Sequence, residues 1–335
     1  MIYTICYDWP STSGNHTGMR YLYEYIQKKN PKLYKLYIFN SGNSFFDRGR
    51  KKKKIAVIFT AVKLALRYRK GDKYLLTEYL HRDSYQILFA KIIRFIHPKA
   101  PIYAMVHLVP EELEKQYSRS RIKRYSQRVT KILTLGNSLT SYLNNMDIHN
   151  VHTLFHYVDT EYYAPAVDTL RKDEELKVIV MGALARDFEK VAYIVSRLAN
   201  INFYICKGRE NVDSLFVGLN NATLIGYVSE SELKHYMNIS DVSLNVMKDT
   251  IGSNVICTSM ATGLAMVVSD VGSIRDYCDE SNACFCLSVD DFIKSITMLA
   301  NDRKKLKSMK EMSIKKAQAL SIDNYDSSLS SLLIR

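Results

Sequence analysis

The most constraining feature of this chain is a regular alternation of short apolar runs with longer stretches of helical spacing. The apolar runs have the length and β-branched content of buried strands, as in "YTICYD" at 3–8 and "AMVVSD" at 265–270. The stretches between them have the length and spacing of helices, as near 84–97 and 110–128. Strands that alternate with helices form βαβ units, so the pattern predicts an α/β protein with parallel sheets.

The alternation runs through both halves of the 335 residues, which predicts two Rossmann-like doubly wound domains. The charged stretch "APAVDTLRKDEEL" contains a proline and lacks strand character, so it marks the boundary. We therefore expect an N-terminal domain over 1–164, a linker over 165–176, a C-terminal domain over 177–315, and a helix over 316–335 that can pack back on the N-terminal domain. Ligands of such sheets bind at the carboxyl ends of strands, and we expect the two domains to face one another across a cleft.

The composition favours an anionic partner. The formal net charge is +13, which suits a nucleotide, a phosphate or a lipid headgroup. No apolar run reaches the roughly 18 residues of a membrane span, and the N-terminal residues are too polar for a signal peptide. The six cysteines lack paired spacing, so we expect reduced core thiols and a cytoplasmic protein.

Three local patterns suit phosphate binding. Gly14 and Gly18 flank a loop between a strand and a helix, where backbone amides can approach a phosphate. Gly252, Ser253 and Asn254 precede a helix over 254–262 in the same way, although a plain capped helix fits them equally well.

The third pattern is cationic. Arg186 follows the strand at 177–182, and Lys190 lies one turn later. Cations at the mouth of a strand can neutralise a diphosphate. A solvated helix face is the alternative, and it fits Lys190 at least as well.

Four segments occur in the order and spacing of family-4 glycosyltransferases of the GT-B fold, and the chain resembles that family. They are "FHYVDTEYYAP" with Val158, Asp159, Tyr163 and Pro165, "GALARDFEK", the segment from Gly226 to Tyr236, and the segment from Ser259 to Gly272. The resemblance covers the C-terminal half closely and the N-terminal half more loosely.

The resemblance implies a retaining hexosyl- or N-acetylhexosaminyltransferase of bacterial surface-polysaccharide type. Its donor would be a nucleotide-diphosphate sugar, expected to be a UDP-sugar, bound mainly to the C-terminal domain. A glycan or lipid-linked acceptor would bind to the N-terminal domain. No cofactor or metal is expected, because arginine, lysine and helix N-termini can offset the charge of the leaving group. The sequence has no Asp-x-Asp motif.

The resemblance also implies roles for individual residues. The loop from Gly14 to Gly18 would approach the donor phosphates, and Arg186 with Lys190 would hold the diphosphate. Tyr227 and Val228 would flank the base. His107 matches a histidine near the transferred sugar, with a surface histidine at a strand end as the alternative.

One departure from the family concerns its usual two glutamates, spaced Glu-x7-Glu. This chain has Thr258 at the second position and Thr250 eight residues earlier, and Asp249 is the acid nearest to the first position. We expect Asp249 to act as the catalytic carboxylate and Thr258 to contact the donor ribose. A threonine hydroxyl cannot supply the charge-assisted bond of a glutamate, worth about 1.5–3 kcal/mol.

The segment "DRGRKKKKIAVIFTAVKLALRYRK" is strongly basic. We expect Lys51, Lys52, Lys53, Lys54, Lys63 and Arg67 to meet an anionic membrane surface, with the protein peripheral on the inner leaflet. The alternative is an ordinary packed helix whose lysine-rich entry is solvated.

Two other functions remain open from the sequence. A GT-B sugar-nucleotide epimerase would share the fold. A nucleic-acid-binding protein would use the positive charge and the 24 tyrosines, although no RRM, KH or helix-turn-helix signature is present. We expect no nucleic-acid partner.

Overall fold

The computed structural model describes residues 1–9, 12–40, 48–166, 175–182 and 184–334, without the side chains of residues 40 and 48–51. These residues separate into two compact units. Unit 1 comprises Met1–Phe155 together with Tyr325–Arg335, and unit 2 comprises His156–Asn324. The predicted boundary after residue 164 differs from this division, because Val158 pairs with Ser321 and the Tyr163 hydroxyl donates to Glu230, both within unit 2.

Unit 1 is built on a six-stranded parallel sheet in the order β2-β1-β3-β4-β5-β6. Its central strands are buried almost throughout, which matches their continuous apolar runs. The strands are β1 (Ile2–Asp8), β2 (Tyr34–Asn40), β3 (Lys73–Leu76), β4 (Ile102–Val106), β5 (Lys131–Thr134) and β6 (Val151–Thr153).

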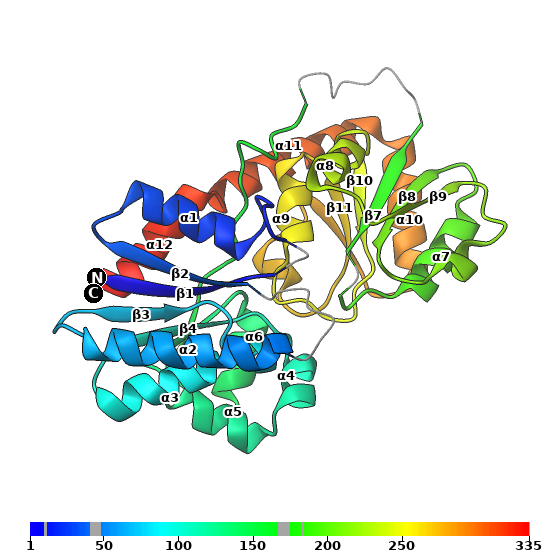
Figure 1. Cartoon of the computed structure of the whole chain (residues 1–335). Helices are drawn as coiled ribbons and strands as arrows, with labels where there is room; N and C mark the ends of the chain where they lie inside the picture. The colour runs from blue at the N-terminus through cyan, green and yellow to red at the C-terminus, as the bar shows by residue number, and fades with distance from the viewer. Residues whose placement is uncertain (10–11, 41–47, 167–174, 183, 335) are drawn as a thin grey trace. The chain divides into compact units, whose positions relative to one another are not determined.

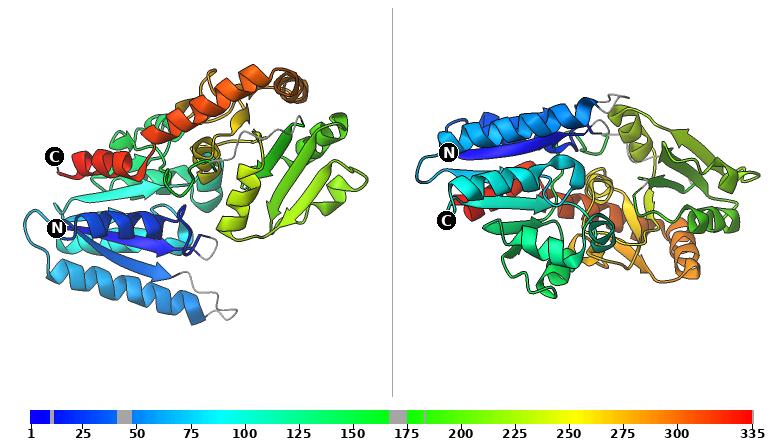
Figure 2. Two further views of the ribbon diagram at one scale, coloured as in Figure 1. Left: turned by 90° about the horizontal axis from the view of Figure 1, so that it is seen from above. Right: turned by 60° about the horizontal axis from the view of Figure 1, so that its bottom comes forward.

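Helices cover both faces of this sheet. Figures 1 and 2 show α1 and α12 on one face and α2 beside α3 on the other. The helices are α1 (Met19–Lys29), α2 (Arg48–Leu66), α3 (Gln86–Ile96), α4 (Pro110–Gln116), α5 (Arg119–Ser126), α6 (Asn137–Asn144) and α12 (Ile322–Ile334), with a 3-10 turn η1 (Arg82–Ser84) before α3.

Helix α12 packs into unit 1 through polar as well as apolar contacts. The Tyr325 and Tyr23 hydroxyls lie 3.1 Å apart, and the Asn30 side-chain amide donates to the Asp326 carboxylate over 3.2 Å. The Lys73 ammonium donates to the Leu333 carbonyl. The buried side of α12 therefore completes one face of the first sheet.

Unit 2 has a second six-stranded parallel sheet in the order β12-β11-β10-β7-β8-β9. Because successive side chains of a strand point to opposite faces, Val178 and Val180 enter one core cluster while Ile179 and Met181 enter another. The strands are β7 (Lys177–Met181), β8 (Asn202–Gly208), β9 (Ala222–Gly226), β10 (Val242–Asn245), β11 (Ala265–Ser269) and β12 (Ala283–Cys286).

The two cores of unit 2 are closed by helices on both faces. Figure 1 shows α7 and α10 on one face and α8, α9 and α11 on the other. The helices are α7 (Phe188–Arg197), α8 (Glu230–Asn238), α9 (Asn254–Ala261), α10 (Val289–Asn301) and α11 (Arg303–Ala319), with 3-10 turns η2 (Asp213–Phe216) and η3 (Ile274–Asp276).

Two parallel sheets flanked by helices confirm the predicted α/β class. The helical stretch predicted near 110–128 consists of two helices, α4 and α5, because Tyr117 and Ser118 between them adopt extended backbone angles. All six cysteines are free, and five are buried. No described helix is both long enough and apolar enough to cross a bilayer.

Candidate functional site

The strand order of unit 2 reverses between β7 and β10, and the loops that follow these two strands meet there. The Asp187 amide donates to the Val246 carbonyl over 3.1 Å, and the Lys248 amide donates to the Ala185 carbonyl over 2.9 Å. Between them, Arg186 forms an antiparallel bridge with Met247. In open α/β sheets such a reversal is where ligands bind.

The Arg186 guanidinium is the unusual group at this reversal. Its Nε and Nη1 atoms are shielded from solvent and have no hydrogen-bond partner among the described residues. Burial lowers the pKa of Arg186 to about 10, so the side chain still carries its charge at neutral pH. A charge that is largely shielded from water and has no counter-charge is costly, which is typical of a site that awaits an anion.

The backbone beside Arg186 is shaped to hold the guanidinium. Ala185 has a φ of 55°, a strained value for a residue with a side chain. A Cβ on Gly182 would lie 3.4 Å from the Arg186 Nε and 3.1 Å from the Val255 Cγ2. The absence of a side chain at Gly182 therefore lets the guanidinium lie close to the first turn of α9.

The N-terminus of α9 forms the adjoining wall. The Ser253 hydroxyl accepts the Ile256 amide over 3.3 Å and caps the helix, with Asn254 as its first residue. The first-turn amides of a helix have no partner within it and attract anions. Gly252 is required here, because its φ is 100° and a Cβ would lie 2.2 Å from the Tyr277 hydroxyl.

Asp249 and Thr250 lie in the same loop as Gly252. The Asp249 Oδ1 accepts the Thr250 amide over 2.7 Å, and the Thr250 carbonyl accepts the Ser273 amide over 2.7 Å. The loops after β10 and β11 are thus joined. The structure places Asp249 at the carboxyl edge of the sheet, and its catalytic role stays a prediction.

Thr258 lies inside α9. Its hydroxyl donates to the Asn254 carbonyl over 2.7 Å, and only 5% of the residue is exposed. A hydroxyl bonded in this way fits a core helix residue, and a ribose would have to compete for its proton. The ribose contact stays a prediction.

Lys190 differs from Arg186 in being exposed and already paired. Its ammonium lies 3.3 Å from an Asp187 carboxylate oxygen, and 58% of its side chain is exposed. The solvated-face alternative therefore describes Lys190 better than a diphosphate contact.

The predicted base site follows β9. Tyr227 is exposed, and the Arg209 guanidinium lies 4.5 Å from the centre of its ring. Val228 packs against the core beneath. Arg209 is not among the predicted site residues, although it follows the end of β8 much as Arg186 follows β7.

In unit 1 the strand order reverses between β1 and β3, and Gln86 joins these strands. Its side-chain amide donates to the Ile5 carbonyl over 2.9 Å, and its Oε1 accepts the Glu78 amide over 2.8 Å. Gly14 lies in the loop after β1, and Gly18 is the N-cap residue of α1. Their approach to donor phosphates stays a prediction.

Titratable groups that are buried or partly buried gather near this reversal. Burial raises the pKa of Glu78 to about 7, opposed by a hydrogen bond from Trp9, whose ring centre lies 4.9 Å from that of His81. Burial lowers the pKa of His107 to about 4, and its Nε2 has no hydrogen-bond partner among the described residues. His107 is therefore neutral at pH 7.

Glu78, Trp9 and His81 are not among the predicted site residues. The signal available was the carboxylate at the end of "KYLLTE", directly after β3. Backbone strain marks the same loop, since Leu80 and Tyr85 both have positive φ angles near 55°.

The raised pKa of Glu78 predicts a pH-dependent stability of unit 1. Its folded pKa of about 7 exceeds the usual 4.5 of a glutamate, so its contribution is complete below pH 4.5 and is lost as the pH rises through 7. As the pH rises from 5.5 to 8, wild type should lose roughly 2 kcal/mol of unfolding free energy that the Glu78→Gln variant does not lose. Trp9 is the single tryptophan of the chain, so its fluorescence during urea unfolding measures this directly. Parallel pH profiles of the two proteins would show that Glu78 keeps an ordinary pKa.

Comparison with protein families supports glycosyl transfer. A family model described as glycosyl transferases group 1 matches residues 158–302, which span the loops around Arg186 and the N-terminus of α9. A comparison with the curated proteins finds no match.

Solved structures show the fold. The protein Alr3699/HepE of Anabaena, solved in complex with UDP, matches with a TM-score of 0.75 at 12% identity, and the alignment covers 99% of each chain. Sucrose-phosphate synthase from Thermosynechococcus elongatus has a TM-score of 0.74 at 12% identity, with 99% of this chain and 97% of that one covered. The lipopolysaccharide outer core galactosyltransferase WaaB has a TM-score of 0.69 at 12% identity, with 100% and 99% covered. The chain therefore has the GT-B fold.

Proposed function

We propose that this protein is a retaining glycosyltransferase that moves a hexosyl or N-acetylhexosaminyl group from a UDP-sugar to a glycan or lipid-linked acceptor. The observation that carries the proposal is the partly buried Arg186 guanidinium at the strand-order reversal of unit 2, which has no counter-charge among the described residues. The group 1 match over residues 158–302 covers the same loops.

The chemistry of the leaving group agrees with this site. Departure of a nucleoside diphosphate leaves negative charge on its terminal phosphate. Arg186 and the positive N-terminal end of the α9 helix dipole offer positive charge to such a group. In this proposal they stabilise the leaving group in the transition state without a metal ion.

The choice of UDP rests on two supports. Tyr227 with the overlying Arg209 offers an exposed aromatic face on which a base can stack. The similar Anabaena protein has been seen with UDP and with UDP-glucose. The likeness to a lipopolysaccharide galactosyltransferase favours a role in bacterial surface-polysaccharide synthesis.

A ligand panel tests the donor. A ligand that binds only the folded state raises stability by RT ln(1 + [L]/Kd), so a true donor should raise the melting temperature well above its competitors. We expect UDP-sugars to stabilise the protein more than GDP-, ADP- or dTDP-sugars. If no nucleotide sugar shifts the melting temperature, and none protects Arg186 from a guanidinium-specific reagent, the proposed function fails.

A second observation favours an anionic membrane surface as a partner of unit 1. Ile55, Phe59, Val62 and Leu66 form one stripe along α2, and they are exposed by 64%, 68%, 37% and 78%. Their spacing of four, three and four residues places them on one side of the helix. Val57, Ala61 and Leu64 occupy the buried side.

Cations border this apolar stripe, although not all of those predicted. Lys52, Lys54 and Arg67 are exposed, and Lys63 is half-buried. Lys53 instead lies over the Tyr7 ring, 5.4 Å from its centre. The side chain of Lys51 lies outside the described residues. We propose that the stripe enters the headgroup region of the inner leaflet while the exposed cations meet anionic lipid.

A further inference from the structure

Unit 1 contains a pocket in which only one lining residue, Lys54, has been given a role so far. Its volume is about 510 Å³, within the range of sites for small ligands. Its walls come from α2, from η1 with the start of α3, and from α5, which lie far apart in the sequence. Five cations line it: Lys54, Arg82, Lys91, Arg124 and Arg128.

The charge of this pocket is uncompensated. No carboxylate lines it, and none of its five cations forms an ion pair among the described residues. Neighbouring cations behave differently: Arg119 lies 2.6 Å from Glu114, and Lys123 lies 3.0 Å from Asp147. Like charges gathered without partners repel each other, which is tolerated where a ligand brings the opposite charge.

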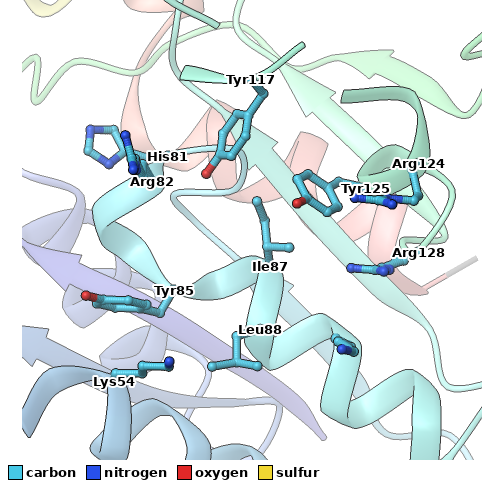
Figure 3. A pocket seen from close by; sticks show the side chains of 11 residues that line it. Lys54, His81, Arg82, Tyr85, Ile87, Leu88, Tyr117, Arg124, Tyr125 and Arg128 are labelled. Carbon is cyan, nitrogen blue, oxygen red and sulfur yellow. The ribbon is translucent and has the colours of Figure 1, made fainter. Parts of the chain in front are cut away.

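The remaining walls suit a ligand with a phosphate at one end. Figure 3 shows Tyr117 and Tyr125 with their hydroxyl ends toward Ile87, and Arg124 and Arg128 beside Tyr125. Both guanidinium groups lie within 5.4 Å of the centre of the Tyr125 ring. Ile87 and Leu88 add an apolar floor.

These walls are fixed by contacts that leave the cations available. The Tyr79 hydroxyl donates to the Tyr125 carbonyl over 2.8 Å, and the Arg82 amide donates to the Gln116 side chain over 2.8 Å. Neither contact uses a charged group. Two hydrogen bonds between side chains and backbone thus fix these walls, and the Arg124 and Arg128 guanidinium groups make no hydrogen bond among the described residues.

We propose that this pocket binds a phosphate group carried by the acceptor, an inference that rests on the proposed glycosyl transfer. A phosphomonoester carries about −1.5 to −2 charges, whereas a carboxylate carries one. Five cations match the larger charge better, and arginine binds phosphate through paired N–H donors. The ligand is a phosphorylated acceptor, either a soluble sugar phosphate or a lipid-linked diphosphate.

Pyrophosphate is the first probe. Binding is measured by calorimetry at low ionic strength in an Arg186→Met background, so that the donor-side guanidinium does not contribute. Arg124→Gln with Arg128→Gln is the pocket variant. Arg119→Gln with Lys123→Gln is the matched control, because these cations lie on α5, as Arg124 does, but outside the pocket.

We expect the pocket variant to bind pyrophosphate about 100-fold more weakly than its parent, since each charge-assisted contact is worth about tenfold or more. The control should bind as the parent does. Trp9 fluorescence melting confirms that unit 1 is folded, and Arg82→Gln with Lys91→Gln is a second pocket variant. Equal affinity of pocket variants and parent, or no binding by the parent at millimolar pyrophosphate, would overturn the proposal.

Two further probes separate the sources of the phosphate. Stronger displacement of pyrophosphate by farnesyl diphosphate supports a lipid-linked acceptor, and stronger displacement by glucose 1-phosphate supports a soluble one. The donor panel is run separately on the protein with Arg186 intact. If the protein binds nucleotide sugars but not pyrophosphate, only the proposal about the pocket fails. If it binds pyrophosphate but no nucleotide sugar, the proposed glycosyl transfer fails and the pocket remains a phosphate site.

Discussion

Replacing Arg186 by methionine should stabilise the unliganded protein and lower its affinity for the nucleotide-sugar donor. Methionine fills similar space without a buried charge, and burial already lowers the pKa of Arg186 to about 10, which shows that the folded site disfavours the charged form. Loss of its charge-assisted bonds to a diphosphate should cost roughly 1.5–3 kcal/mol of affinity, or about 10- to 150-fold in Kd. Differential scanning calorimetry and titration calorimetry with UDP-sugar measure the two effects.

The opposite signs of these effects make the test discriminating. A structural arginine would lower the melting temperature when it is removed and leave the nucleotide affinity unchanged. Arg197→Met is the control, because Arg197 is an exposed cation at the end of α7 in the same unit. If Arg186→Met behaves as Arg197→Met does in titration, Arg186 is not a donor contact.

The second large effect concerns vesicle binding by α2. Phe59→Ser with Leu66→Ser should abolish sedimentation with anionic vesicles, because burying each side chain in an apolar phase is worth about 1.5–3 kcal/mol. Neutralising Lys52 and Arg67, two exposed cations beside this stripe, should also weaken binding, by about 1 kcal/mol for each residue near the surface. Wild-type binding should fall as salt rises, since the Debye length shortens from about 10 Å at 0.1 M to about 3 Å at 1 M.

The control for vesicle binding is an equally apolar exposed pair elsewhere. Val217 and Leu287 are 81% and 85% exposed in unit 2, so Val217→Ser with Leu287→Ser should bind vesicles as wild type does. Both serine pairs replace exposed side chains, so neither should lower the melting temperature. Wild-type protein that stays in the supernatant at low salt would rule out the membrane surface as a partner.

The strands could be predicted because each is a buried apolar run, and burial on both faces leaves a clear mark in sequence. The position of Arg186 could also be predicted, because a cation in the loop that follows a strand lies at the carboxyl edge of a parallel sheet, whereas its role as a donor contact stays a prediction. In each case the evidence is local, within a few residues of the chain.

The rest depends on contacts that sequence spacing does not reveal. The break between α4 and α5 depends on two extended residues, Tyr117 and Ser118, with neither proline nor glycine between the helices. The pocket cations come from positions between 54 and 128, and only the packing of α2, α3 and α5 brings them together. The buried state of Glu78 likewise follows from the pairing of β3 with its neighbours.

The grouping of Tyr325–Arg335 with Met1–Phe155 has a consequence for biosynthesis. Residues 156–324 form a continuous stretch of chain inserted into a discontinuous first unit, and they leave the ribosome before Tyr325 does. The second unit can therefore gain its native contacts during translation, whereas the first unit must wait for α12 before Tyr23 and Asn30 find their partners. During that interval the apolar side chains of the first unit that α12 will cover remain open to solvent.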